Sequence, residues 1–298
     1  MLNTCPWSSV LAAETSNKLT EKEMKKGKVA CVIIGAMGRM GQRLCQLSAA
    51  SDDFVLVGGT ESLQSGCAGK TLKELMGLGD GSQRLVEKLE DMPEPFDAVI
   101  DFTFPVVSMA TARFCARTGK AAVIGSTGFT PEQTAELKAL SGSFPCVCAP
   151  NMSMGVNTLF KIAADVARIL HDGFDVEILE MHHRHKKDAP SGTAMRIADI
   201  LADAYGWSLD RAGVYERRGI TGERRRDEVG IQTLRGGDVV GEHTVMFVGT
   251  GERIELVHRA QSRDCFVQGA LYAAKWLMGR SAGMYDMQDV LGLRDAVA

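Results

Sequence analysis

The sequence predicts an α/β protein made of a Rossmann-type dinucleotide-binding domain and a second α+β domain with an open mixed β-sheet. Two observations carry this prediction. Near the start, the continuously apolar segment 29–34 runs into a glycine-rich turn and a helical pattern, which is typical of the first βαβ unit of a dinucleotide-binding fold. Towards the end, residues 229–259 alternate between apolar and polar in three short segments, which is typical of strands in an antiparallel sheet.

Composition sets the broad class of the protein. The chain has 298 residues, of which 45% are hydrophobic, and this is enough for one large or two ordinary domains. A formal net charge of −3 gives no electrostatic footprint for nucleic acid or an anionic membrane, and no apolar run approaches the length of a membrane span. The eight cysteines lie mostly inside apolar stretches, and the close pair Cys146 and Cys148 lacks the C-x-x-C spacing of redox or zinc sites. We therefore expect a cytoplasmic protein with no nucleic-acid or membrane partner.

Residues 1–27 stand apart from this fold. They lack the charged and apolar regions of a signal peptide, and Glu14, Glu21 and Glu23 argue against a transit peptide. We expect a disordered N-terminal extension, or an upstream start codon chosen in error ahead of Met24.

The glycine-rich segment after the first strand is the first candidate site. It reads Gly35-Ala36-Met37-Gly38-Arg39-Met40-Gly41 and departs from strict G-x-G-x-x-G because Met37 takes the place of the second glycine. A helix through Leu47 and a strand at 54–57 follow, and Glu61 lies about 20 residues after the last glycine, a suitable distance for a carboxylate that binds ribose hydroxyls. We expect Gly35 to Met40 to cradle a pyrophosphate and Glu61 to hold the ribose. The alternatives are a glycine turn without a cofactor and an Arg39 that only faces solvent.

Strand and helix patterns then alternate along the first domain. A helical piece at 72–76, a strand at 98–103, a helix opened by Pro105 and a strand at 121–124 precede a helix after Thr130 and a strand at 146–148. The carboxyl ends of parallel strands share one edge of the sheet, and the ligand lies in the crevice outside that edge. We therefore expect the segments after two of these strands to line the cofactor: Gly125, Ser126 and Thr127, and Ala149, Pro150, Asn151 and Met152.

The second domain begins with a helical pattern over 156–170 and a strand from Phe174. A helix over 194–202 and strands at 230–235, 242–248 and 253–258 complete an open sheet backed by two helices, with one face free for an oligomer interface. The charged loop 219–227 is expected to be mobile, as either a solvated lid or a binding element. This loop holds Arg224, Arg225 and Arg226, and a last helix over 266–277 could pack back on the first domain.

Residues 180–194 are the most unusual stretch of the chain. Three histidines, an arginine and two lysines fill 182–187, directly after a strand and directly before a helix that begins near Ser191. The free N–H groups of Gly192 and Thr193, with the positive end of the helix dipole, would hold a carboxylate or a phosphate. The alternative is a solvated basic surface in which Ser191 is only an N-cap.

These motifs together resemble the 4-hydroxy-tetrahydrodipicolinate (dihydrodipicolinate) reductase family of the bacterial diaminopimelate and lysine pathway. The resemblance covers residues 28 to about 293 and includes 35–41, 101–103, 125–129, 151–157, 180–194 and 237–244. The histidine stretch that runs into Pro190-Ser191-Gly192-Thr193-Ala194 is the most specific of these. The resemblance implies a homotetramer of two-domain subunits, in which residues 28–153 and 264–298 bind the dinucleotide and residues 154–263 bind the substrate and mediate oligomerisation.

The resemblance also implies the chemistry, in which NADH or NADPH reduces a six-membered cyclic imine that carries two carboxylates. His182 would be the proton donor or acceptor and Lys186 the second proton donor. The small dicarboxylate would be held by His183, Ser191, Gly192 and Thr193. From the residues themselves, hydride addition to a conjugated imine leaves an electron-rich carbon that a nearby His or Lys can protonate. His182 and His183 point to opposite faces if the strand continues, so we expect them to differ in role.

The residue after Glu61 bears on the choice of cofactor. Members of the family that use NADPH well often carry an arginine there, which meets the 2′-phosphate, whereas this chain has Ser62. Glu61 would repel that phosphate, so we expect NADH to be preferred or at least equal, unless Arg39 rescues NADPH binding.

Three other interpretations explain less of the sequence. A metal site could use His183 and His185, but Arg184, Lys186 and Lys187 would repel a cation, so we expect no metal. A non-catalytic NAD-sensing module would explain the glycine loop but not the acid and base groups beside an anion-binding helix start. Another two-domain nicotinamide-dependent dehydrogenase that acts on a small carboxylate would share the architecture but not the intact histidine stretch.

Overall fold

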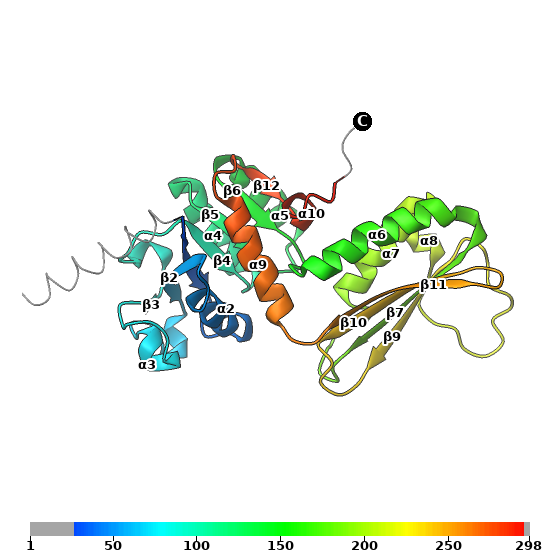
Figure 1. The fold of residues 1–298 in the computed structure, drawn as a ribbon, viewed down its shortest axis with the longest axis horizontal. Helices are drawn as coiled ribbons and strands as arrows, with labels where there is room; N and C mark the ends of the chain where they lie inside the picture. Colours follow the sequence, from blue (N-terminus) through cyan, green and yellow to red (C-terminus); the bar gives the residue numbers. More distant parts are fainter. Residues whose placement is uncertain (1–26, 295–298) are drawn as a thin grey trace, which may run out of the picture. The chain divides into compact units, whose positions relative to one another are not determined.

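The computed structural model describes residues 27–294, so the predicted N-terminal extension lies outside the described residues except for Gly27. The described chain folds into two compact units (Figure 1). The first unit holds residues 27–149 and 267–290, and the second holds 150–266 and 291–294. The sequence predicts borders after 153 and before 264 and assigns 264–298 to the first domain, whereas residues 291–294 fall in the second unit. Across residues 27–294, none of the helices combines the length and apolar character that crossing a membrane requires.

The first unit is built on a parallel seven-stranded sheet with the strand order β12-β6-β5-β4-β1-β2-β3. Its strands are β1 Val29–Ile34, β2 Phe54–Thr60, β3 Arg84–Val86, β4 Ala98–Asp101, β5 Ala121–Ile124, β6 Pro145–Cys148 and β12 Gly283–Tyr285. Every position of β1 is buried, which confirms that the apolar run is a central strand covered on both faces. The chain moves outwards from β1 to β3 and then returns to the other side of β1 with β4, and such a switch point opens a crevice for a ligand.

The helices of this unit are α2 Arg39–Ala49, α3 Leu72–Met76, α4 Pro105–Thr118, α5 Pro131–Leu140, α9 Asp264–Leu277 and α10 Met287–Val290. Three of them, α3, α4 and α5, begin at a capping box or at a proline. Pro105 and Pro131 occupy the first position of α4 and α5, where the missing N–H would have no partner in the helix. Thr130 forms a capping box with Gln133, so the predicted helix after Thr130 is confirmed.

The second unit contains a five-stranded sheet with the order β11-β10-β7-β9-β8. Its strands are β7 Asp175–His182, β8 Gly213–Val214, β9 Val229–Arg235, β10 Gly241–Val248 and β11 Arg253–Ala260. The prediction of antiparallel pairing throughout 229–259 is wrong for β9, which runs parallel to both β7 and β8. The reason is that β7 lies between β9 and β10, and the long connection from β7 to β9 contains a helix, as a parallel pairing requires.

Two helices cover one face of this sheet, as expected (Figure 1). They are α6 Met154–Leu170 and α7 Gly192–Tyr205, and the short α8 Leu209–Ala212 follows. Along β7 every second residue is buried, from Val176 to His182, so these side chains share the face that the helices cover. Val176 and Ile178 belong to the hydrophobic core of the unit, and Glu180 and His182 are its buried polar continuation. The alternate residues form the opposite side of the sheet, which we call the outer face. It includes Leu179 and Met181 of β7, Leu234 of β9, Met246 of β10 and Val257 of β11.

Arg224 is anchored to β7, whereas the other residues of the loop 219–227 are exposed. Its guanidinium donates hydrogen bonds to Glu177 Oε1 at 3.0 Å, to Asp175 Oδ1 at 2.9 Å and to the carbonyl oxygens of Val176 and Glu228 at 3.0 and 2.8 Å. Only 19% of its side chain is exposed. The expectation of a solvated lid is therefore corrected at this residue, because the carboxylates that bind Arg224 lie on β7, far earlier in the sequence.

Candidate active site

The glycine-rich loop has the geometry of a phosphate cradle. Gly35 takes a positive φ of 65°, and a Cβ on Gly41 would lie 2.1 Å from the Gly35 carbonyl oxygen, so α2 can approach the loop only with glycine at that contact. Gly38 is the N-cap of α2 and offers no side-chain hydrogen bond to the first turn. The first N–H groups of α2 thus have no side-chain cap, which suits a pyrophosphate. In the same loop Ala36 is buried, Met40 is half-buried and Arg39 is exposed.

Glu61 is held against this loop. Its Oε2 accepts a hydrogen bond from the Met37 N–H at 3.0 Å, and its Oε1 accepts one from the Ser62 N–H at 3.0 Å. The backbone N–H of Glu61 donates to the Val86 carbonyl, which fixes the residue just beyond the end of β2. These bonds leave acceptor positions on both oxygens for ribose hydroxyls. Met37, at the position of the missing second glycine, therefore contributes its N–H to the site and does not disrupt the turn.

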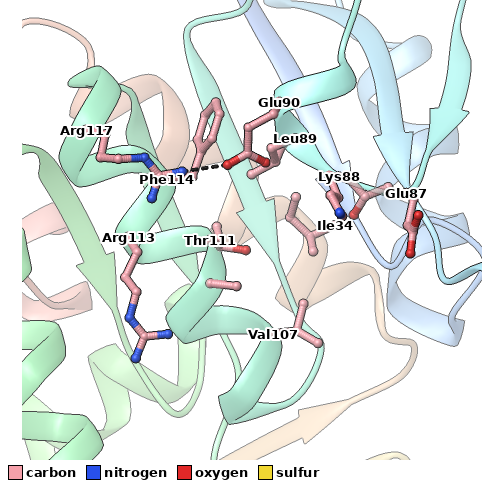
Figure 2. Close-up of a pocket in the computed structure, with 12 residues that line it drawn as sticks. Ile34, Glu87, Lys88, Leu89, Glu90, Val107, Thr111, Arg113, Phe114 and Arg117 are labelled. Carbon is pink, nitrogen blue, oxygen red and sulfur yellow. Dashed lines mark hydrogen bonds and ion pairs between the residues drawn. The ribbon is translucent and has the colours of Figure 1, made fainter.

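A cavity of about 360 Å³ lies in the same unit, at the ends of β1 and β2 and beside α4 (Figure 2). Its lining comes from Ile34 and Thr60, from residues 87–90, and from the α4 residues Val107, Ala110, Thr111, Arg113, Phe114 and Arg117. Its size is in the range of small-ligand pockets, and its place beside the switch point is where the adenosine half of a dinucleotide can lie. No sequence motif predicts this wall, because residues 62–95 carry none and only the strand order brings 87–90 to α4.

The two segments predicted to line the cofactor differ in what they present. A Cβ on Gly125 would lie 2.4 Å from the Phe102 ring, so this position requires glycine. The Ser126 side chain is buried and points towards Ser108 and Asp101, whereas Thr127 is exposed. Any contact from Ser126 to a cofactor would therefore come from its backbone.

The segment after β6 crosses from the first unit to the second. Ala149 is buried in the first unit, whereas Pro150, Asn151 and Met152 belong to the second. Pro150 is exposed and Met152 is buried. Asn151 donates from Nδ2 to Thr193 Oγ1 at 3.1 Å, so the structure brings this predicted cofactor residue to a predicted substrate residue.

Glu180 is the buried anchor of the second unit's site. Its carboxylate has no exposed surface and accepts hydrogen bonds from both terminal nitrogens of Arg235, at 2.8 and 2.9 Å, and from the Ser191 N–H at 2.9 Å. Burial alone would raise the pKa of Glu180. The hydrogen bonds from His182, Arg235 and Ser191 outweigh burial and lower that pKa to about 2, so the carboxylate is charged at neutral pH.

His182 is oriented by this carboxylate. Its Nδ1 lies 2.6 Å from Glu180 Oε2. Because an ionised carboxylate can only accept, Nδ1 must carry the proton, and Nε2 is the nitrogen that can exchange a proton with a ligand. A Cβ on Gly241, the first residue of β10, would lie 2.9 Å from Nε2. β7 ends at His182, so the strand alternation does not extend to His183, but the two rings do have different surroundings.

His243 is a further buried histidine beside His182, and no sequence motif predicts this contact. It stands opposite Glu180 in the register of β10 on β7, and its ring lies 5.2 Å from that of His182. Its Nε2 is 3.1 Å from Ser191 Oγ, which also caps α7 by accepting the Ala194 N–H. Burial, and next the charge of His182, lower the pKa of His243 to about 3, so this ring is neutral at physiological pH. The Ser191 side chain thus serves the scaffold as an N-cap.

The remaining predicted substrate residues lie at the start of α7 and after β7. Gly192 is exposed and Thr193 is half-buried. Lys186 Nζ pairs with Asp188 Oδ2 at 2.9 Å, and only 21% of the Lys186 side chain is exposed. Burial and then the positive charges of His185, Arg263, His182 and Lys186 lower the pKa of His183. This positive field, at a helix N-terminus, favours an anionic ligand.

The fold and site together define the class of two-domain nicotinamide-dependent oxidoreductases. Sequence models of the N-terminal and C-terminal parts of dihydrodipicolinate reductase match residues 29–152 and 155–291. The chain belongs to the dihydrodipicolinate reductase family.

Named relatives agree with this assignment. The chain is 50% identical over 266 residues to a 4-hydroxy-tetrahydrodipicolinate reductase from Syntrophobacter fumaroxidans, with 89% of this chain and 100% of the relative covered. It is 51% identical over 264 residues to one from Desulfotalea psychrophila, with coverages of 89% and 98%. The structure matches dipicolinate-bound dihydrodipicolinate reductase from Paenisporosarcina sp. TG-14 with a TM-score of 0.70, 25% identity and coverages of 88% and 98%. An amine dehydrogenase from Mycobacterium smegmatis, at 15% identity and a TM-score of 0.55, with 90% of this chain and 97% of that one covered, shares the fold only.

Proposed function

We propose that this protein reduces the cyclic imine formed from 4-hydroxy-tetrahydrodipicolinate to tetrahydrodipicolinate, in the diaminopimelate and lysine pathway. The observation that carries the proposal is the buried Glu180–His182 pair at the end of β7, next to the anion-binding start of α7. A proton-transfer group and a carboxylate-binding group are what the reduction of a dicarboxylate imine requires.

The residues of the second unit's site would have separate roles in substrate binding and proton transfer. The N–H groups of Gly192 and Thr193 and the ammonium of Lys186 would bind the substrate carboxylates, with His183 beside them. His182 would deliver a proton from Nε2 to the electron-rich carbon, and the Glu180 carboxylate would stabilise the imidazolium before transfer. Lys186, held by Asp188, would be the second proton donor.

The residues of the first unit fit a bound NADH or NADPH, which would supply the hydride. Gly35 to Met40 and the start of α2 would hold the pyrophosphate, and Glu61 the ribose. We propose that NADH is preferred or equal to NADPH, because Glu61 is fixed by two backbone N–H groups and would repel a 2′-phosphate.

The experiment that tests the activity is a coupled assay. The upstream synthase generates the imine, and the loss of NADH absorbance is followed with and without that synthase. Oxidation that depends on the synthase would support the proposal. Oxidation with an open-chain keto dicarboxylate, but not with the cyclic imine, would instead favour another dehydrogenase of the same architecture.

We further propose a cytoplasmic homotetramer. The cysteines within residues 27–294 are all free thiols, as expected in a reducing compartment. The outer face of the second unit's sheet presents apolar side chains, with Leu234 47% and Val257 42% exposed, which suits a second copy of the chain. Sedimentation of Leu234→Asp and Val257→Asp should show smaller species. The matched control is Ile169→Asp on α6, which is 78% exposed and not on that face, and it should sediment as the wild type does.

A further inference from the structure

Asp101, the last residue of β4, has no part in the mechanism above. It is fully buried in the first unit. Its Oδ1 accepts hydrogen bonds from the Thr103 N–H at 2.8 Å and the Thr103 hydroxyl at 2.6 Å, and it lies 3.5 Å from Ser126 Oγ. Its Oδ2 is buried and has no hydrogen-bond partner within the described chain. A buried carboxyl with an oxygen left unpaired is rare enough to need a reason.

Thr103 connects Asp101 to the glycine-rich loop. The Thr103 Cγ2 methyl lies 2.6 Å from where a Cβ on Gly35 would be, so this methyl fills the space above the first glycine. The Thr103 hydroxyl and N–H, both bound to Asp101, fix the side chain in the orientation that puts the methyl there. The position of the loop therefore depends on the carboxyl behind it.

Ser126 connects Asp101 to the second cofactor segment. Its buried hydroxyl lies 2.7 Å from Ser108 Oγ on α4 and 3.5 Å from Asp101 Oδ1. The Ser126 side chain thus faces into the unit, which leaves the backbone of residues 125–127 to face a ligand. One buried carboxyl contacts the supports of both segments.

We propose that Asp101 is a positioning residue for the dinucleotide, which fixes the glycine-rich loop through Thr103 and the 125–127 segment through Ser126. This inference rests on the proposed function, because it takes the bound group to be a nicotinamide dinucleotide. An apolar residue at 101 would pack as well as the acid but would leave the Thr103 N–H and hydroxyl without an acceptor. The carboxyl group of Asp101 is therefore needed to hold the loops in place, and it is not needed to fill the core.

Burial raises the pKa of Asp101 and favours the neutral acid. Asparagine has nearly the shape of aspartate, and its side-chain carbonyl oxygen can replace Oδ1 as the acceptor of both Thr103 hydrogen bonds. Asp101→Asn should therefore rescue what Asp101→Ala loses, and this comparison separates positioning from a need for negative charge.

The test measures the dissociation constant of NADH by direct titration of the full-length protein, together with the KM for the imine at saturating NADH. Asp101→Ala and Thr103→Val should weaken NADH binding about tenfold and leave the KM for the imine unchanged, whereas Asp101→Asn should bind as the wild type does. Thr103→Val keeps the branched shape and loses the hydroxyl, so it remains a test if Asp101→Ala fails to fold. The matched control is Thr118→Val at the far end of α4, whose hydroxyl donates only to the Phe114 carbonyl at 2.9 Å, and it should not change NADH binding.

Two results would overturn the inference: NADH affinity within about twofold of wild type in both Asp101→Ala and Thr103→Val, or equal loss in Asp101→Asn and Asp101→Ala. A wild-type protein that binds neither NADH nor NADPH would instead overturn the proposed function, and this outcome is distinct from both.

Discussion

Replacing Glu180 by glutamine keeps the size of the side chain but removes the charge at the end of β7. In the native protein this carboxylate faces His182 Nδ1 at 2.6 Å and both terminal nitrogens of Arg235 at 2.8 and 2.9 Å. The change leaves Arg235 without its counter-ion and puts an amide against donors that need an acceptor. We expect a large loss of stability together with a loss of turnover.

The magnitude follows from the pKa of Glu180, which falls from an ordinary value of 4.5 to about 2 in the folded protein. A difference of this size corresponds to about 3 kcal/mol of unfolding free energy at neutral pH. Because the folded-state pKa is the lower one, this contribution is complete above pH 4.5 and disappears as the pH falls towards 2. The stability gap between wild type and Glu180→Gln should therefore be about 3 kcal/mol at pH 7 and narrow below pH 4.5.

Urea unfolding at several pH values measures the gap, and steady-state kinetics at neutral pH should show turnover reduced by about tenfold or more, with NADH affinity unchanged. The matched control is Glu136→Gln, which breaks an exposed pair with Arg113 and should cost less than about 1 kcal/mol. If Glu180→Gln is as stable as the wild type at pH 7, or if the gap does not depend on pH, the electrostatic reasoning is refuted.

Four further substitutions test the other parts of the site and fold. His182→Gln should lower turnover by about a hundredfold, with NADH affinity near wild type in direct titration. Thr193→Val should mainly raise the KM for the imine. Normal turnover in His182→Gln would assign proton transfer to Lys186 or water. Glu61→Gln should raise the catalytic efficiency with NADPH relative to that with NADH by about tenfold, because it removes the charge that repels the 2′-phosphate. An unchanged ratio of the two efficiencies in parallel assays would show that Glu61 does not set the preference between the cofactors. Arg224→Ala should lower the unfolding free energy by about 2 kcal/mol, since two partly buried ion pairs to β7 are lost, and should leave turnover per folded molecule intact. An unchanged melting temperature would contradict this role.

Most of the fold could be predicted from local patterns. The apolar run of β1, the prolines that begin α4 and α5, and the alternation along β7 each reflect the physics of neighbouring residues, and the structure has these elements where the sequence places them. The direction of β9 could not be predicted in this way. An alternating strand reads the same whether its neighbour is parallel or antiparallel, and only the strand order decides.

The candidate site also has one part that the sequence predicts and another part that only the strand order brings together. Glu180 and His182 are two residues apart on one strand, so their shared face follows from the sequence alone. Arg235 and His243 reach the same place from β9 and β10, and nothing in their own neighbourhoods distinguishes them from other strand residues. The contacts of Arg224 could not be predicted for the same reason, because a run of charges does not reveal the carboxylates that another strand places beside it.

Adding a side chain at Gly241 should inhibit the enzyme without altering any ionisable group. A methyl group there would press on His182 Nε2, and the ring cannot retreat without stretching its short bond to Glu180. Gly241→Ala should therefore block the proton path by bulk alone, while both ligand-binding segments keep their native chemistry. Such a variant would bind its ligands but transfer the proton slowly, so its crystals should show the site with ligands bound.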